Sequence, residues 1–305
     1  MNQHVFLDLF TLRMAALQAG RDRFFHHNAK SAPLAEHLKA VRFASPPDLT
    51  RGPHEMPADT LAGRVDPAFL VQQWRGNSFP TIIYHHGNQE HPFELKGSAR
   101  NTFRTVLADG ARDIDANLIA IRAPFHRWPT RDYLRRMGDI TNFIAMLATS
   151  VNLIDQIVSA CHDIGSSPVM VSGISLGGTT TNLHRTYYNT ADLYVPLLAG
   201  AAQGDVFTST PYRRLVGGQG RRHPELVQEL LNFDDDYQKV ATDNVFPLLA
   251  RYDQYVVFER QSTCYEYCPI RIMERGHFTA ALSPTLLRQH IADVLHGNVP
   301  SLHTS

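Results

Sequence analysis

Residues 168–178 read Pro-Val-Met-Val-Ser-Gly-Ile-Ser-Leu-Gly-Gly, and this stretch decides the fold. Its apolar first half predicts a buried strand, and a helix is expected over 177–188. Between them, residues 173–177 match the pattern G-x-S-x-G. A serine on such a sharp strand-to-helix turn exposes its hydroxyl, and the flanking glycines keep other side chains out of the turn. Ser175 is therefore predicted to be a nucleophile at the end of a strand.

Apolar runs of strand length recur on both sides of this turn. They predict strands over 81–84, 117–121, 193–198, 245–250 and 270–273. Helical patterns cover 133–164 and 284–296. Weaker strand signals at 39–43 and 64–74 indicate an opening antiparallel pair. Strands that alternate with helices in this way predict an α/β fold, in which a parallel sheet has helices on both faces and ligands bind beyond the carboxyl ends of the strands.

The whole chain, 1–305, is interpreted as a single domain with two additions. An amphipathic pattern over 1–30 predicts a helix packed on the domain edge, within a helical extension that covers 1–38. Residues 44–60 contain four prolines and are expected to form a surface loop. Residues 201–244 are too long for a plain connection between two strands, which predicts a small inserted cap, or lid, over the site.

A nucleophilic serine needs a base, and the base needs a carboxylate that orients it. His277 follows the last predicted strand and precedes the last helix, so it is the expected base. Asp253 follows the 245–250 strand and is the favoured acid. Asp205, after the 193–198 strand, is the alternative acid, and Asp243 and Glu259 are weaker alternatives.

Acyl transfer also requires donors for a developing oxyanion. The residue after the nucleophile, Leu176, supplies one backbone N–H in this architecture, and the loop after the 81–84 strand supplies the second. That loop begins His85-His86-Gly87-Asn88, and the glycine lets the backbone approach a substrate. The N–H groups of Leu176 and Asn88 are therefore the predicted oxyanion hole, whereas the two histidines are expected to be structural.

From about residue 65 to 296 the chain resembles enzymes of the α/β-hydrolase fold. The likeness rests on HHGN at 85–88, GISLGG at 173–178, Asp253 after a strand, and GH at 276–277. It implies a mostly parallel eight-stranded sheet, a triad of serine, histidine and acid, and no required cofactor or metal. The expected activity is cleavage of a carboxylic ester or thioester through an acyl-enzyme. The same triad would also serve an acyltransferase, and a non-catalytic binding protein with this fold is the third alternative.

Composition excludes several other classes. The chain has 29 Lys plus Arg and 29 Asp plus Glu, so its net charge of zero gives no support to nucleic-acid binding. Charged residues interrupt the apolar N-terminal stretch, which predicts neither a membrane anchor nor a signal sequence. Three cysteines are too few for a disulfide framework and favour a cytoplasmic location. The expected partner is a small-molecule ester or thioester, and the sequence leaves a homo-oligomer open.

Overall fold

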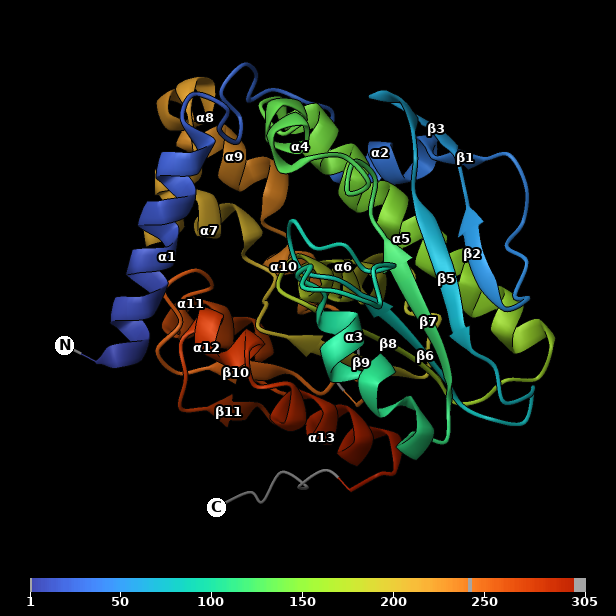
Figure 1. Ribbon diagram of the computed structural model, residues 1–305. Helices are drawn as coiled ribbons and strands as arrows, with labels where there is room; N and C mark the ends of the chain where they lie inside the picture. Colours follow the sequence, from blue (N-terminus) through green and yellow to red (C-terminus); the bar gives the residue numbers. More distant parts are fainter. Residues whose placement is uncertain (1, 241–242, 299–305) are drawn as a thin grey trace.

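A computed structural model describes residues 2–240 and 243–298, and its centre is an eight-stranded sheet (Figure 1). The strand order is β11-β10-β9-β8-β6-β7-β5-β2. Neighbouring strands from β11 to β7 are parallel, whereas β5 is antiparallel to both β7 and β2. The strands are β2 (Gly52–Glu55), β5 (Ala68–Gln73), β6 (Thr81–His85), β7 (Asn117–Arg122), β8 (Val169–Ile174), β9 (Leu193–Leu197), β10 (Leu248–Ala250) and β11 (Arg271–Met273). The predicted mostly parallel, eight-stranded sheet is confirmed.

Helices cover both faces of the sheet, because successive side chains of a strand point in opposite directions. On β6, Ile83 joins a core with Ile154 of α5, whereas Ile82 joins a second core with Phe103 of α3 and Ile291 of α13. The first core is covered by α2 (Leu34–Ala40), α5 (Ile140–Asp163) and α6 (Leu176–Tyr187). The second is covered by α3 (Thr102–Val106), the 3₁₀ turn η1 (Ala108–Asp113) and α13 (Pro284–Leu295).

Helix α5 is the one helix in the described ranges whose length and composition would let it cross a membrane. In this fold 72% of its most apolar 18-residue window is buried within the protein. Packing against the sheet therefore accounts for its apolar character.

The N-terminal helix is shorter than the predicted 1–30. Helix α1 (Gln3–Ala19) ends at Gly20, whose φ of +56° lies in the left-handed region that stops a helix. The next residues run as a non-helical segment in which Phe24 and Phe25 are completely buried. Their rings pack on Phe143 and Phe207, so burial of two aromatic side chains outweighs the local helical pattern.

The prediction of one helix over 133–164 is also wrong. Helix α4 (Thr130–Arg136) ends before Gly138, and α5 begins at Ile140. The side chain of Asp139 caps the new helix by accepting a hydrogen bond from the N–H of Thr141 at 2.8 Å. A capping aspartate within an apolar periodic pattern thus divides it into two helices.

Residues 44–60, expected to be a loop, contain two strands. Strand β2 is at the sheet edge, where Pro53 is tolerated because an edge strand has unpaired N–H positions. Residues 39–43, expected to pair with 64–74, contribute only β1 (Arg42–Phe43). It forms a separate small sheet with β3 (Ala58–Thr60) and β4 (Gly63–Val65).

The expected cap, 201–244, forms a group of short helical segments after β9, of which residues 241–242 lie outside the described ranges. They are α7 (Gln203–Thr208), η2 (Pro211–Leu215), α8 (Gly218–Arg222), α9 (Pro224–Leu231) and α10 (Asp234–Tyr237). Helix α1 packs on η2 and on α12, and Figure 1 shows it running along the same side as α8 and α9. Besides β11 and α13, the elements after β10 are α11 (Phe258–Ser262), η3 (Thr263–Tyr265) and α12 (His277–Ala281).

Candidate active site

Ser175 is at the tight turn between β8 and α6. Its φ of +55° is in a region that non-glycine residues rarely adopt, so the backbone there is strained. A Cβ on Gly173 would lie 2.5 Å from the carbonyl carbon of Gly177, and one on Gly177 would collide with the carbonyl oxygen of His85. The turn therefore needs glycine at both positions, as the G-x-S-x-G pattern predicts.

The structure brings His277 and Asp253 to this serine from two other strand ends. The Nε2 atom of His277 lies 3.0 Å from Oγ of Ser175, and its Nδ1 lies 2.6 Å from Oδ2 of Asp253. Asp253 also accepts hydrogen bonds from the N–H groups of Tyr255 and Val256, at 2.7 and 2.8 Å. These bonds fix the carboxylate, so the ring of His277 is held with one nitrogen toward the acid and the other toward the serine.

Burial and charge act in opposite directions on His277. Burial alone lowers the pKa of the imidazole, but the charge and the hydrogen bond of Asp253 outweigh it, with a smaller contribution from Asp8. The net result is a pKa above the ordinary value of a histidine, although the cation of Arg100 opposes the increase. The ring of Tyr255 stacks on His277 with 4.6 Å between centroids and restricts its rotation. His277 can therefore accept a proton from Ser175, and Asp253 can stabilise the resulting imidazolium.

The two predicted oxyanion donors border the same space. Asn88, Ser175 and Leu176 line a narrow pocket of about 30 Å³, whose other walls are largely apolar or aromatic. No acceptor in the described part of the chain takes a hydrogen bond from the N–H of Asn88 or of Leu176. Two N–H groups beside the serine hydroxyl are thus available to a ligand.

Side-chain contacts hold the Asn88 loop in place. The hydroxyl of Tyr133 donates to Oδ1 of Asn88 at 2.6 Å, and Nδ2 of Asn88 donates to the hydroxyl of Tyr212 at 3.2 Å. Beneath the loop, the buried carboxylate of Glu90 accepts hydrogen bonds from the N–H and the hydroxyl of Thr102 at 2.8 and 2.7 Å. Glu90 therefore ties the loop to α3, a role that its position in the sequence did not reveal.

His85 and His86 are both completely buried. Nδ1 of His85 lies 3.0 Å from the carbonyl oxygen of His86, and Nε2 of His86 accepts a hydrogen bond from the N–H of Ala123 at 3.1 Å. Burial lowers the pKa of His85 to about 4 and that of His86 well below its ordinary value. Both rings are therefore neutral near pH 7 and take part in local hydrogen bonds.

Asp8 is a buried acid that sequence reasoning did not assign to the site. Its side chain, on α1, accepts hydrogen bonds from the N–H groups of Gln254, His277 and Phe278 at 3.0, 2.8 and 2.9 Å. It thereby links the loop of Asp253 to the start of α12. The available signal was its helical spacing with Leu12, since an acid on the apolar face of a helix requires buried partners.

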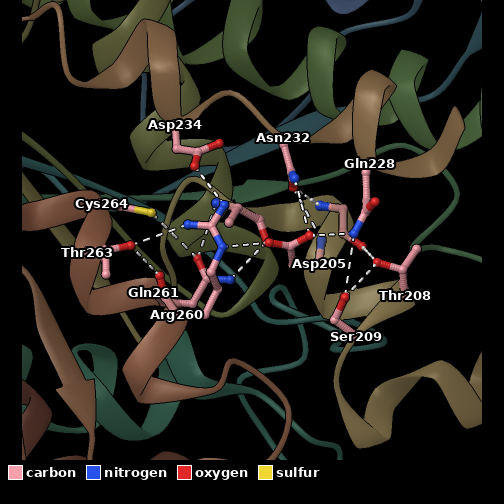
Figure 2. Close-up of polar contacts among 12 residues, drawn as sticks. Asp205, Thr208, Ser209, Gln228, Asn232, Asp234, Arg260, Gln261, Thr263 and Cys264 are labelled. Atoms are coloured by element: carbon pink, nitrogen blue, oxygen red, sulfur yellow. Dashed lines mark hydrogen bonds and ion pairs between the residues drawn. The ribbon is translucent and has the colours of Figure 1, made fainter. Parts of the chain in front are cut away.

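The alternative acid, Asp205, belongs to a different network (Figure 2). Its carboxylate pairs with Nε of Arg260 at 2.6 Å, and the same guanidinium pairs with Asp234 at 2.7 Å. Asp205 also accepts a hydrogen bond from Gln228 at 2.8 Å. Asp205 therefore links α7 to α9 and α11 and has no hydrogen bond to His277. The weaker alternatives, Asp243 and Glu259, also form no hydrogen bond or ion pair with that imidazole among the described residues.

A cleft of about 470 Å³ also opens at the serine. It is lined by Ser175, His277 and Asn88, by residues of α1, and by the 98–105 segment. Within the ranges that the structure describes, no group of three or more His, Cys, Asp or Glu side chains is placed to hold a metal ion. The polar groups that line the cleft include the hydroxyl of Ser175, the imidazole of His277, the carboxylate of Glu90 and the guanidinium groups of Arg100 and Arg104.

Comparison with solved structures identifies the same fold elsewhere. The acylaminoacyl peptidase of Pyrococcus horikoshii aligns with a TM-score of 0.54 and 12% identity over 80% of this chain and 40% of the peptidase, so this chain matches less than half of that protein. A cold-adapted esterase from an Arctic intertidal metagenomic library aligns with a TM-score of 0.52 and 14% identity, covering 84% of this chain and 98% of the esterase. Est1E from Butyrivibrio proteoclasticus gives the same TM-score and identity, covering 80% and 99%. These TM-scores show that the fold is shared, and at identities of 12–14% they show the fold alone.

A search of curated proteins gave no match. The model of one protein family, in contrast, matches residues 42–217, which is more than half of the chain and includes the Asn88 loop and the Ser175 turn. The chain therefore belongs to the family described as alpha/beta hydrolase domain containing 18, within the α/β-hydrolase superfamily.

Proposed function

We propose that this chain is a serine hydrolase that cleaves a carboxylic ester or thioester through an acyl-enzyme on Ser175. The observation that carries the proposal is the continuous hydrogen-bonded series from Oγ of Ser175 through His277 to Asp253. The strained φ of Ser175 supports it, because backbone strain at a tight turn of this kind is typical of a functional site.

In each step of the proposed reaction, the proton moves through the imidazole of His277. Oγ of Ser175 forms a bond to the substrate carbonyl carbon while Nε2 of His277 takes its proton, and Asp253 stabilises the imidazolium. The N–H groups of Asn88 and Leu176 donate to the oxyanion. The bond to the leaving oxygen or sulfur then breaks, and His277 protonates that atom. Water, deprotonated by His277, attacks the acyl-enzyme and releases the carboxylic acid and free Ser175.

The first test is reaction of the purified protein with a fluorescent fluorophosphonate, alongside Ser175→Ala. Labelling of the wild type alone is the expected result, together with hydrolysis of p-nitrophenyl acetate that Ser175→Ala abolishes. A folded wild type that neither reacts nor hydrolyses the ester would contradict the proposal and favour a non-catalytic binding protein.

Acyl transfer remains the second candidate, because the same acyl-enzyme can react with an alcohol when water is excluded. Product analysis with an added alcohol separates the two activities. Free acid as the main product supports hydrolysis, and a new ester at the expense of the acid supports transfer. For location we propose the cytoplasm, since Cys161, Cys264 and Cys268 are all buried and unpaired.

A further inference from the structure

Two hollows of different size meet at Ser175. The narrow pocket is lined by Asn88, Ser175 and Leu176, whereas the 470 Å³ cleft is lined by Ser175 and His277. In the proposed reaction His277 must protonate the leaving atom, so the leaving group has to lie on the side of its imidazole. Of these two hollows, only the cleft has His277 in its wall. The cleft is therefore the place for the leaving group, and the narrow pocket receives the carbonyl oxygen.

One side of the cleft is lined mainly by apolar side chains, and another by polar and basic ones. Helix α1 and the 278–282 segment supply mainly apolar side chains, among them Leu12, Ala15, Phe278, Ala281 and Leu282. The 98–105 segment supplies polar and basic ones: Ser98, Arg100, Asn101, Thr102, Arg104 and Thr105. A leaving group with both apolar and negatively charged parts would match this division.

Arg100 is an exposed cation in this lining without an acidic partner. Arg122, Arg260 and Arg271 all pair with carboxylates, but no acidic side chain in the described ranges is within ion-pair distance of Arg100. Arg104 also has no carboxylate partner among these residues, but it is less exposed and its guanidinium already donates a hydrogen bond to the carbonyl oxygen of Gly97. Arg100 is therefore the cleft arginine whose guanidinium has neither a hydrogen bond nor an ion pair within the described ranges.

The charge of Arg100 reaches the catalytic end of the cleft. Burial raises the pKa values of Glu90, Tyr212 and Tyr255, which line the cleft, and the Arg100 cation opposes each increase. It likewise opposes the increase in the pKa of His277, which lines the same cleft. Glu90 is an acid in that lining, but it is buried, its carboxylate accepts two hydrogen bonds from Thr102, and it forms no ion pair with Arg100. It does not neutralise Arg100 directly, so an anionic ligand meets an unpaired guanidinium.

We propose that the cleft selects substrates whose leaving group carries a carboxylate or phosphate, and that Arg100 pairs with this anion. The inference rests on the proposed serine hydrolase function and specifies the substrate class of that site. A guanidinium offers two parallel N–H donors to either oxyanion, which makes the contact strong as well as directional.

The test compares acetyl esters that share an aryl leaving group. The neutral ester is methyl 4-acetoxybenzoate, and the anionic ones are 4-acetoxybenzoate and 4-acetoxyphenyl phosphate. Each kcat/KM is divided by the rate of hydroxide hydrolysis of the same ester, which removes differences in intrinsic reactivity. We expect the wild type to favour an anionic ester, and Arg100→Gln to lower the anionic-to-neutral ratio by on the order of tenfold. The anionic ester whose corrected kcat/KM exceeds that of the neutral ester by the larger factor identifies the anion that the cleft prefers.

Arg64→Gln is the matched control, because Arg64 is an exposed arginine that does not line the cleft. It should leave the ratio unchanged. The preference of the wild type should also weaken as NaCl is raised, since salt screens an exposed charge pair. A ratio that is the same in wild type and Arg100→Gln would overturn the inference.

A second readout does not depend on the anionic esters. Loss of the Arg100 cation should move the acidic limb of the pH profile with the neutral ester to higher pH, because this cation opposes the increase in the pKa of His277 that Asp253 produces. An unmoved profile would contradict an electrostatic effect of Arg100 on the base. If fluorophosphonate does not label Ser175 and none of the esters is hydrolysed, the proposed function itself fails. Hydrolysis of the neutral ester without a preference for anions contradicts only the inference on Arg100.

Discussion

The carboxylate of Asp8 accepts a hydrogen bond from the backbone N–H of His277 at 2.8 Å, across 269 positions of the chain. The same carboxylate holds Gln254, next to Asp253, and Phe278, next to His277. A Cβ on Gly276 would lie 2.7 Å from its Oδ2 atom, so the backbone approaches Asp8 as closely as glycine allows. The N-terminal helix is thus built into the site, and Asp8 acts as a positioning residue for the acid and the base.

Asp8→Asn should lower kcat/KM with a neutral ester by about 10- to 100-fold, because an amide nitrogen would face N–H groups that now donate to an oxygen. The negative charge of Asp8 raises the pKa of His277, so its loss should also move the acidic limb of the pH profile to lower pH. Steady-state kinetics from pH 5 to 9 measures both effects.

Asp59→Asn is the control for Asp8, since it removes one negative charge from an exposed position on β3. It should change neither kcat/KM nor the profile. If Asp8→Asn lost activity while the midpoint of the profile stayed in place, Asp8 would support the fold without acting on His277.

The second prediction concerns the pH dependence of the wild type. His277 must be neutral to accept the proton of Ser175, and the neighbouring carboxylate of Asp253 holds its pKa above the ordinary value despite burial. Activity should therefore rise with pH through a midpoint above about 6.5, the usual pKa of histidine. Replacement His277→Ala should reduce kcat by about 10³-fold or more. Activity that persists in His277→Ala would show that another group is the base.

The third prediction concerns Asp253, whose side chain is only 2% exposed. Asp253→Asn should keep the fold but lower kcat by about 10³- to 10⁴-fold, because an asparagine favours the wrong imidazole tautomer and cannot stabilise the imidazolium. Fluorophosphonate labelling rates measure the reactivity of Ser175, and far-UV circular dichroism measures whether the fold is kept. A variant that is labelled as fast as the wild type would remove Asp253 from the mechanism.

The fourth prediction separates Asp205 from Asp253. Asp205→Asn breaks a charged pair with Arg260 that links α7 to α11 (Figure 2), so it should destabilise the protein by about 1.5–3 kcal/mol. The fluorophosphonate labelling rate of the folded variant should remain close to that of the wild type. Urea unfolding measures the loss of folding stability. A large loss of labelling in a folded Asp205→Asn protein would restore Asp205 as a candidate acid.

Local patterns in the sequence were sufficient for the central part of the fold. The apolar strands, the Ser175 turn and the places of His277 and Asp253 after strands follow from rules that act over a few residues: strand periodicity, glycine in a strained turn, and polar residues after strand ends. They predicted which residues the sheet brings to one edge, because parallel strands all end at that edge.

Only the tertiary structure decided what depends on contacts between distant segments. Helix α1 ends at Ala19 because the following Phe24 and Phe25 are buried against Phe143 and Phe207, which no local pattern could show. Asp205 is the alternative acid by sequence, and its ion pair with Arg260 accounts for it in the structure. By sequence Asp8 is one of the charged residues that interrupt the apolar N-terminal stretch, yet its three hydrogen-bond donors come from residues more than 240 positions away. The sequence by itself determined the chemistry of the strand ends, and long-range burial and hydrogen bonding determined which other side chains hold that chemistry in place.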